Sequence, residues 1–264
     1  MSDDFSLDDV IGRYAHKPDK LGKPELILSY GQAGSGKSYL AATAADLPSV
    51  KHVLYLDTEG SSVGVLSNIK NANKIDVVRV DKHPQPFQFL ATLLSDGKQG
   101  LFNTENATKY DVVVVDTLDV AQDMAVDYFM EHAPLGSSGN KDTFAAWKNV
   151  KVWTLSVAQG LKRLDALAIL VMHDREEKSE TGAITKRLAV QGSARDILPG
   201  IPDVVAFLER KVKKGVPTTT AFFGVEDTKV TKDRFGFPPQ VDNVTIPALY
   251  AMIDAKNKEK NEAQ

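Results

Sequence analysis

The chain has 264 residues, which suits one larger α/β domain or two small ones because single hydrophobic cores stop growing near this size, and we expect one domain. Hydrophobic residues make up 42% and charged residues 25%, so the composition predicts a globular protein and excludes wholesale disorder. The net charge of −3 excludes a global basic field, and nucleic acid would have to bind a local patch. The absence of cysteine excludes disulfides, thiolate metal sites and cysteine nucleophiles.

Two sequence features predict where the protein is located. The acidic start, Met1–Asp4, lacks the basic and then apolar pattern of a signal peptide. No apolar run approaches the length that spans a bilayer. We therefore expect a cytoplasmic protein without a membrane partner.

The composition divides the chain into three parts. Residues 1–24 are polar and end in the basic, proline-bearing stretch Lys17–Pro24, which predicts a lead-in to the first strand. Residues 25–253 carry the apolar periodicity of the main domain. Residues 254–264 are charged, and we expect this C-terminal tail to fray.

The main domain begins with a predicted strand, a glycine-rich loop and a helix in direct succession. Glu25–Tyr30 is apolar, as a buried strand requires. The loop Gly31–Ser38 follows, and the alanines of Lys37–Asp46 favour a helix. This succession is the setting in which a glycine-rich loop binds phosphate.

Apolar runs then alternate with helical patterns. Near-continuous hydrophobicity is typical of strands that are buried on both faces, as in parallel sheets. Such runs lie at residues 52–56, 77–80, 112–115 and 167–172, and helical patterns lie at residues 86–94, 120–130 and 147–164. The alternation predicts an α/β fold with a doubly wound, mostly parallel sheet.

The end of the domain changes character. β-like segments at residues 204–208, 218–224 and 228–231 follow one another with short connections, which predicts a late antiparallel flank of the sheet. Before them, the helix over residues 147–164 repeats apolar residues on one face, and Trp147 belongs to that face. We expect Trp147 to pack in the core, and we give neither Trp147 nor Trp153 a role in stacking on bases.

The strongest functional signal is the pattern Gly31-x-x-x-x-Gly36-Lys37-Ser38. Its glycines let backbone N–H groups face phosphate oxygens, Lys37 reaches the β- and γ-phosphates, and Ser38 ligates Mg²⁺. The predicted cofactors are therefore ATP and Mg²⁺. The residues expected to contact the nucleotide are Gly31, Gln32, Ala33, Gly34, Ser35, Gly36, Lys37, Ser38 and Tyr39.

Asp116 ends an apolar run of four valines. In proteins with a phosphate loop, a carboxylate in this position lies beside the magnesium shell. The alternative is a turn aspartate that merely ends a strand. With the loop upstream, we assign Asp116 to the Mg²⁺ site and to catalysis.

Asp57 and Glu59 follow the strand that ends at Leu56. A carboxylate at that edge could polarise the water that attacks the γ-phosphorus, and Glu59 is the candidate base. A solvated loop acid before the turn glycine Gly60 is the alternative. Asp57 and Asp119 are the substitutes if Glu59 is not the base.

His173 closes the strand over residues 167–172 and could contact the γ-phosphate. The alternative is a histidine that is satisfied structurally. No second histidine lies near it in the sequence, which argues against a histidine metal site.

Residues 174–200 are polar and mixed in charge, and their length predicts a functional or mobile loop. Its acids nearly balance its bases, so a solvated loop is the alternative to a nucleic-acid contact. The candidate contacts to single-stranded DNA are Lys178, Lys186, Arg187 and Arg195. Residues 132–143 are a second flexible candidate.

Taken in order, Gly31–Ser38, Glu59, Asp116 and His173 resemble the RecA-like ATPase family, especially small phage-encoded proteins linked to single-strand annealing and recombination. The resemblance implies that Glu59 activates water and that His173 stands where RecA has a γ-phosphate-sensing Gln. It also implies action on single-stranded DNA in recombination or repair and self-assembly into a ring or filament. A single-strand-binding protein is a further expected partner, and a bacterial host's cytoplasm is the expected location.

The segment Thr231–Gly236 resembles the Lys-Asn-Arg-Phe-Gly element of the bacterial RadA protein, with Asp233 in place of Asn. The resemblance implies that Lys232 and Arg234 project into the ATP site of a neighbouring subunit and take part in catalysis there. An exposed basic turn is the alternative. The zinc finger and the protease-like domain of RadA have no counterpart in this chain.

Three other functions remain open. Asp57–Gly60 matches the DxxG pattern of a GTPase switch loop, but it follows Lys37 too soon, and no NKxD motif for guanine is present. A small-molecule kinase would need a lid and an acceptor pocket. A nucleotide-gated scaffold or loader would show negligible turnover.

Overall fold

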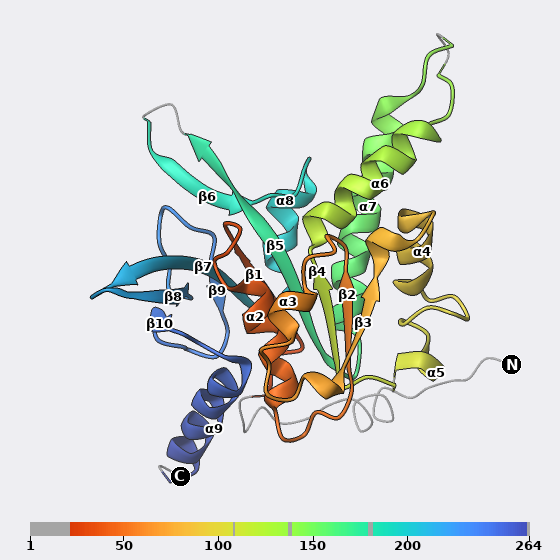
Figure 1. Cartoon of the computed structure of the whole chain (residues 1–264). Coiled ribbons are helices and arrows are strands. Elements are labelled where there is room, and N and C mark those ends of the chain that lie inside the picture. Colours follow the sequence, from red (N-terminus) through yellow and green to blue (C-terminus); the bar gives the residue numbers. More distant parts are fainter. Residues whose placement is uncertain (1–21, 108, 137–138, 179–181, 263–264) are drawn as a thin grey trace, which may run out of the picture.

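The computed structural model describes residues 22–107, 109–136, 139–178 and 182–262. Within them the strands form one sheet in the order β10-β8-β7-β1-β5-β4-β2-β3, with β6 beside β5 and β9 beside β7 (Figure 1). The parallel strands at its centre are β1 (Leu26–Gly31), β2 (Val53–Asp57), β3 (Ile75–Arg79), β4 (Val112–Asp116), β5 (Leu167–Lys178) and β7 (Val204–Lys213). The antiparallel strands are β6 (Ile184–Leu188), β8 (Val216–Phe222), β9 (Lys232–Asp233) and β10 (Gln240–Asp242). The predicted fold class, with its late antiparallel flank, is confirmed.

The central strands form because their sequences are apolar and rich in β-branched residues. Every residue of β1, β2 and β4 is buried. Valine and isoleucine pack well on a pleated surface, and a strand that is covered on both faces has no polar face. The parallel register places Asp57 beside Asp116 and Gly31 beside His173. The carboxyl edge of the sheet therefore collects the residues that the sequence marks as functional.

Helices cover both faces of the sheet, as a doubly wound fold requires. One face packs against α2 (Lys37–Ala42), η1 (Thr43–Asp46), α3 (Val63–Leu66) and α9 (Ile246–Glu262). The other face packs against α4 (Pro86–Leu93), α6 (Leu118–Glu131), α7 (Thr143–Lys162) and α8 (Ala194–Ile197). Short connecting helices are α5 (Thr104–Ala107), η2 (Ala72–Lys74), η3 (Val80–Lys82) and η4 (Leu198–Gly200). None of the described helices is long and apolar enough to span a bilayer.

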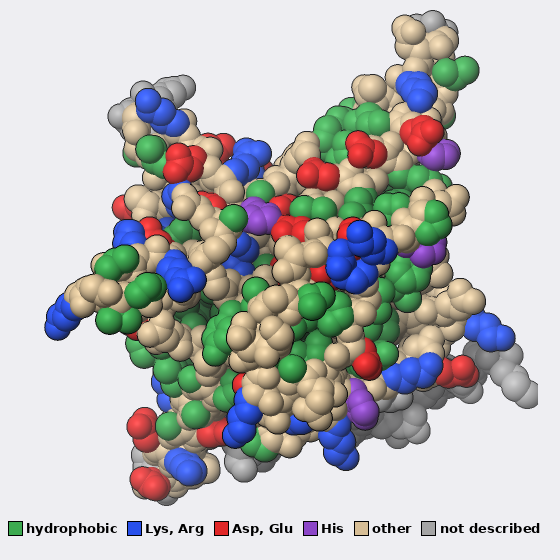
Figure 2. All heavy atoms as spheres, in the orientation of Figure 1, with side chains coloured by type: hydrophobic (Ala, Val, Ile, Leu, Met, Phe, Trp, Pro, Cys, Tyr) green, Lys and Arg blue, Asp and Glu red, His purple; other side chains and the backbone are tan. Residues whose placement is uncertain are grey.

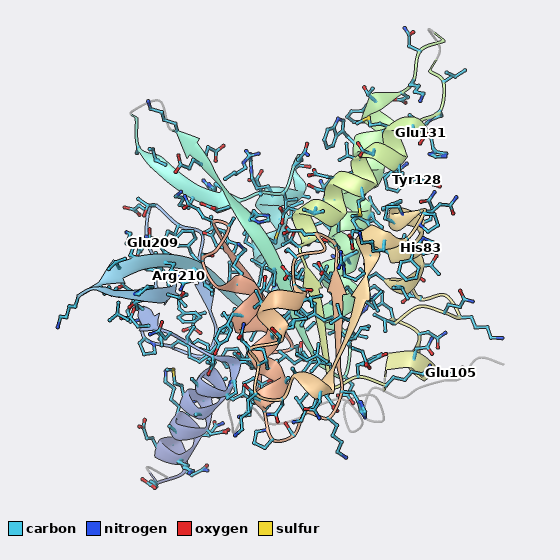
Figure 3. The ribbon with its side chains drawn as sticks, in the orientation of Figure 1. His83, Glu105, Tyr128, Glu131, Glu209 and Arg210 are labelled. Carbon is cyan, nitrogen blue, oxygen red and sulfur yellow. The ribbon has the colours of Figure 1, made fainter. Side chains whose placement is uncertain are left out.

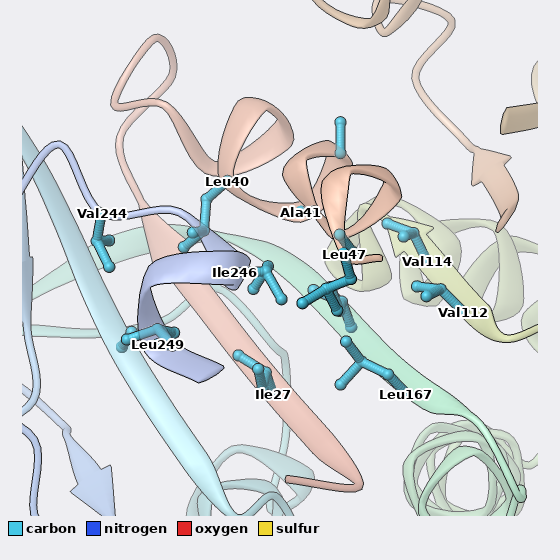
Figure 4. Packing of buried hydrophobic residues seen from close by; sticks show 14 of the residues in the cluster. Ile27, Leu40, Ala41, Leu47, Val112, Val114, Leu167, Val244, Ile246 and Leu249 are labelled. Atoms are coloured by element: carbon cyan, nitrogen blue, oxygen red, sulfur yellow. The ribbon is translucent and has the colours of Figure 1, made fainter. Parts of the chain in front are cut away.

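The core on the first face holds the helix after the glycine-rich loop against the sheet. Leu40 of α2 and Ile27 of β1 belong to the same buried cluster as Ile246 and Leu249 of α9 (Figure 4). The backbone N–H of Ile246 donates to the hydroxyl of Thr43 at 2.9 Å, which joins the start of α9 to the end of α2. The glycine-rich loop thus has a well-packed base.

Two arms project beyond the carboxyl edge of the sheet, the β5–β6 hairpin and the α6–α7 pair (Figure 1). The prediction of a long loop over residues 174–200 is wrong, because most of this segment is the hairpin and α8. The hairpin is stabilised by opposite charges across its strands, as where Glu176 faces Lys186. A mixed-charge sequence therefore looked like a loop although it pairs as strands.

Three further expectations are corrected. Residues 254–262 continue α9 instead of fraying, since buried Ile253 and the residues before it anchor the helix. Residues 228–231 contain an isolated bridge at Lys229 rather than a strand, and the pairing strand is β9. Trp147 is 37% exposed, whereas Val150 one turn later is buried, because the arm extends past the sheet that would cover Trp147. Of the predicted lead-in, residues 1–21 lie outside the described residues.

Candidate active site

The glycine-rich loop, Gly31–Ser38, joins β1 to α2 at the carboxyl edge of the sheet. Gly36 has a φ of +98°, a backbone conformation that favours glycine. Gly31 passes so close to β7 that a Cβ there would collide with the carbonyl oxygen of Leu208. Ser35 Oγ is buried and has no hydrogen-bond partner among the described residues. The loop is thus a preformed polar cradle at the start of a helix, which is where phosphates bind in proteins.

Lys37 is the cation of this cradle. Its side chain is buried, and Nζ donates to the carbonyl oxygens of Gly31 at 2.9 Å and Gln32 at 2.8 Å. Burial lowers the pKa of Lys37, while the carboxylates of Asp116, Asp119 and Glu59 act in the opposite direction. A buried ammonium group held only by carbonyl dipoles and neighbouring acids is well placed to bind an anion.

Asp116 and Ser38 form the second part of the site. Asp116 is buried, and its carboxylate accepts hydrogen bonds from the hydroxyls of Tyr55 and Ser38. Burial raises the pKa of Asp116, and these two hydrogen bonds oppose that shift. A hydroxyl and a carboxylate in contact beside a phosphate loop are the oxygen ligands that Mg²⁺ prefers, so the residues present fit this ion.

Glu59 lies next to Asp116 because β2 and β4 are neighbours. The hydroxyl of Thr117 donates to Glu59 Oε1 at 2.9 Å, which fixes the carboxylate at the edge of the cavity that Lys37 and Asp116 also line. The other acid of this loop, Asp57, is instead buried and builds the turn: its carboxylate accepts the N–H of Gly60 at 2.7 Å and the hydroxyl of Ser62 at 2.5 Å. Glu59 is therefore the acid that is free to act on a ligand, and Asp57 is not.

His173 contacts two acids at once. Its Nδ1 lies 2.8 Å from Asp119 Oδ2 and 3.4 Å from Glu59 Oε1, and its backbone N–H donates to Asp119 Oδ1 at 3.0 Å. The hydrogen bond with Asp119 raises the pKa of His173, although partial burial opposes the shift. Burial acts to raise the pKa of Asp119, but the hydrogen bonds from His173 outweigh it and hold this pKa below its usual range. The pair therefore favours a charged histidine beside Glu59.

These groups line one cavity of about 730 Å³, called the main cavity here. Figure 2 shows acidic side chains and a histidine at the base of the space between the two arms. The predicted site residues that line the cavity are Ala33, Gly34, Gly36, Lys37, Ser38, Tyr39, Glu59, Asp116 and His173. Gln32 and Ser35 line a smaller cavity behind the loop, of about 330 Å³.

One wall of the main cavity has no signal in the sequence. It comes from the late β flank and the segment before α9: Leu208, Arg210, Pro217, Thr219, Asn243, Val244 and Thr245. A second missed group follows Glu59, namely Ser61, Gly64, Val65 and Asn68. None of these residues belongs to a sequence motif. The pairing of β7 with β8 brings Arg210 and Thr219 together only in the folded chain, and residues 243–245 follow β10. The sequence offers Asp119 only as a substitute acid, and its contact with His173 has no sequence signal beyond its place after Asp116.

Lys232 and Arg234 lie away from the main cavity. The strand β9 pairs with the first residues of β7, Val204 and Val205, at the opposite edge of the sheet from the glycine-rich loop. Arg234 Nη1 lies 3.0 Å from Asp203 Oδ1, and Lys232 Nζ donates to the carbonyl oxygen of Gly200 at 2.6 Å. The Arg234 side chain is still 54% exposed. Neither residue lines the main cavity of its own chain.

The candidate DNA contacts lie on and beside the β5–β6 hairpin. Lys186 forms ion pairs with Asp174 at 3.1 Å and Glu176 at 2.7 Å. Arg187 and Arg195 both face Glu177, at 3.2 Å and 3.8 Å. Lys178, the last residue of β5, is exposed. The three paired bases are therefore partly neutralised by acids on the same arm.

The fold is of the RecA-like P-loop type, and the site brings together the groups that a nucleotide-binding site requires. The chain matches the family described as AAA domain over residues 23–235, and it belongs to that family. Among solved structures it is similar to the RadB recombinase, with a TM-score of 0.50, 17% identity and coverage of 83% of this chain and 86% of that chain. It is also similar to the flagellar accessory protein FlaH from Methanocaldococcus jannaschii, with a TM-score of 0.47, 14% identity and coverage of 90% and 92%. No curated protein sequence matches the chain.

Proposed function

We propose that this protein binds and hydrolyses Mg-ATP and uses the cycle to act on single-stranded DNA in recombination or repair, as a ring or filament. One observation carries the ATPase part. Lys37, the Ser38–Asp116 pair and Glu59 come from three separate strands or strand ends and meet in one cavity. A phosphate-binding cation, a pair of magnesium ligands and a base are the parts that ATP hydrolysis needs.

Each group has a distinct role in this proposal. The loop N–H groups and Lys37 bind the phosphates, and Ser38 and Asp116 hold the metal. Mg²⁺, when bound, neutralises the charge that develops on the phosphates. Glu59 accepts a proton from the attacking water, and the charged His173 donates to the terminal phosphate and holds Glu59 in place.

The DNA part rests on the resemblance to recombination ATPases and on the position of the β5–β6 hairpin. This arm continues β5 directly beyond His173, so the segment that carries Lys186 and Arg187 starts at the nucleotide site. The hydroxyl of Tyr30, the residue before the glycine-rich loop, also donates to the carbonyl oxygen of Lys186 at 3.3 Å. A change at the phosphates thus has two short routes to the arm.

The test is the rate of phosphate release from ATP with and without single-stranded DNA. We expect DNA to raise the rate. Rapid ATP hydrolysis that DNA leaves unchanged would refute the DNA part alone. Phosphorylation of an added small molecule would favour the kinase, binding without turnover would favour the scaffold or loader, and a preference for GTP in competition would favour the GTPase.

A further inference from the structure

A side chain outside every sequence motif faces the phosphate-binding loop. Arg210 lies on β7 directly opposite Thr219 of β8 in the antiparallel register. Opposite residues of an antiparallel pair project from the same face of the sheet. Thr219 in turn packs on the loop, since a Cβ on Gly36 would lie 3.0 Å from Thr219 Oγ1. Arg210 therefore projects on the face of the hairpin that meets the glycine-rich loop.

The cavities lead to the same conclusion. Arg210 lines the main cavity together with Ala33, Gly34, Gly36 and Lys37. Its neighbours Glu209 and Lys211 share with it the lining of the smaller cavity, but neither of them lines the main cavity. Its side chain thus stands beside the crest of the loop, on the wall of the space that the phosphates would enter.

Within the described part of the chain, the charge of Arg210 has no acidic partner. None of the ion pairs among the described residues includes it. Its two sequence neighbours behave differently: Glu209 and Lys211 project from the opposite face and pair with each other at 2.8 Å. Figure 3 labels Glu209 and Arg210 as neighbours on β7. An arginine without an acid, beside a phosphate-binding loop, is available to a bound anion.

We infer that Arg210 is a second phosphate-binding cation, which contacts the phosphates of the nucleotide held by the loop of its own chain. The inference rests on the proposed nucleotide site and adds a residue to it. It differs in kind from the expected role of Arg234, which would act on a neighbour. The late β flank would then sense nucleotide directly, through the strand pair β7–β8.

Binding of Mg-ATP and Mg-ADP to the full chain, measured by calorimetry, tests the inference. Arg210→Ala should weaken ATP binding roughly 10- to 100-fold, as expected for loss of a charge-assisted hydrogen bond. Arg210→Lys should restore part of the affinity, because it keeps the charge but loses the planar fork. Lys213→Ala is the matched control, since it removes a positive charge from the opposite face of the same strand and lines neither cavity, and it should bind as the parent does.

The outcomes separate this inference from the proposed function. If Arg210→Ala binds ATP as tightly as the parent while Lys37→Ala loses binding, the role of Arg210 is refuted and the nucleotide site stands. If Lys37→Ala also binds normally, the proposed site itself fails. An equal loss in Arg210→Ala and Lys213→Ala would show a general effect of charge on the strand and would overturn the specific contact. Circular dichroism of each variant confirms that β7 still folds.

Discussion

At the scale of single residues, the site combines groups whose roles are set by what each one touches. Asp57 and Glu59 are two positions apart. The Asp57 carboxylate accepts hydrogen bonds within the turn, whereas Glu59 faces the main cavity beside His173. Asp119 fixes His173 through both its backbone and its ring. The chemistry that we propose therefore divides the acids into one base, one metal ligand, one positioning residue and one turn residue.

Glu59→Gln is expected to keep the affinity for ATP and to lower kcat strongly. General-base catalysis is typically worth about 10²- to 10⁴-fold, and the amide keeps the shape and the hydrogen bond from Thr117 while losing the basicity. Steady-state hydrolysis and equilibrium binding measured on the same protein check this. Turnover at the parental rate would move the role of base to Asp119, since Asp57 is occupied by its turn.

Asp119→Asn is expected to lower the pKa of His173. The ordinary histidine value is 6.5, and Asp119 holds the His173 pKa above it. A raised pKa in the folded state gives stability that is complete below about pH 6.5 and is lost as the pH rises through the folded value. Titration of the His173 ring by NMR should show the fall, and the variant should lose this pH dependence of unfolding. An unchanged titration would show that Asp119 does not control the charge.

At the scale of elements, the sequence predicted most of what is local. Adjacent residues define the glycine-rich loop, the strand that ends in Asp116 and the alternation of strands and helices. The spacing of residues along the chain is therefore enough to predict them. The β5–β6 hairpin was missed because its strands are charged on both faces and stabilised by cross-strand pairs. The wall formed by Arg210 and Thr219 was missed because only tertiary pairing brings it to the loop.

Neutralising Lys186, Arg187 and Arg195 together is expected to weaken binding of single-stranded DNA and to flatten its dependence on salt. Each phosphate contact releases counterions, so the slope reports how many contacts are made. Affinity for ATP should barely change. A control that neutralises the exposed Lys70, Lys258 and Lys260, which lie away from the hairpin, removes the same charge. If the hairpin variant kept the parental salt slope, the hairpin would not contact DNA, and residues 132–143 would be the remaining candidate.

At the scale of the whole molecule, the two basic positions Arg210 and Arg234 lie toward opposite edges of one sheet. The first stands at the chain's own loop, and the second is exposed where a neighbour could meet it. In a ring or filament, each site would then be completed by a group from the next subunit. This arrangement predicts an ATPase whose activity depends on assembly.

Arg234→Ala is expected to cripple hydrolysis and to leave nucleotide binding largely intact, since an arginine finger is typically worth about 10³ to 10⁵ in kcat. Mixing it with Lys37→Ala should regain activity, because mixed oligomers contain interfaces with one intact Lys37 and one intact Arg234. Lys162→Met is the matched control, because it also removes a cation that pairs with the Asp203 carboxylate, at 2.6 Å, and so shows the effect of losing an ion pair there. A mixture that stays inactive although the two proteins co-assemble would return Arg234 to a structural ion pair.

Lys37→Ala decides whether the glycine-rich loop binds ATP for hydrolysis. The measurement is phosphate release from Mg-ATP by the parent and by the variant, each verified as folded. We predict clear turnover by the parent and its loss in the variant, because Lys37 supplies the buried charge that stabilises the transferring phosphate. Equal turnover by the two proteins would show that the glycine-rich loop is not the site of ATP hydrolysis.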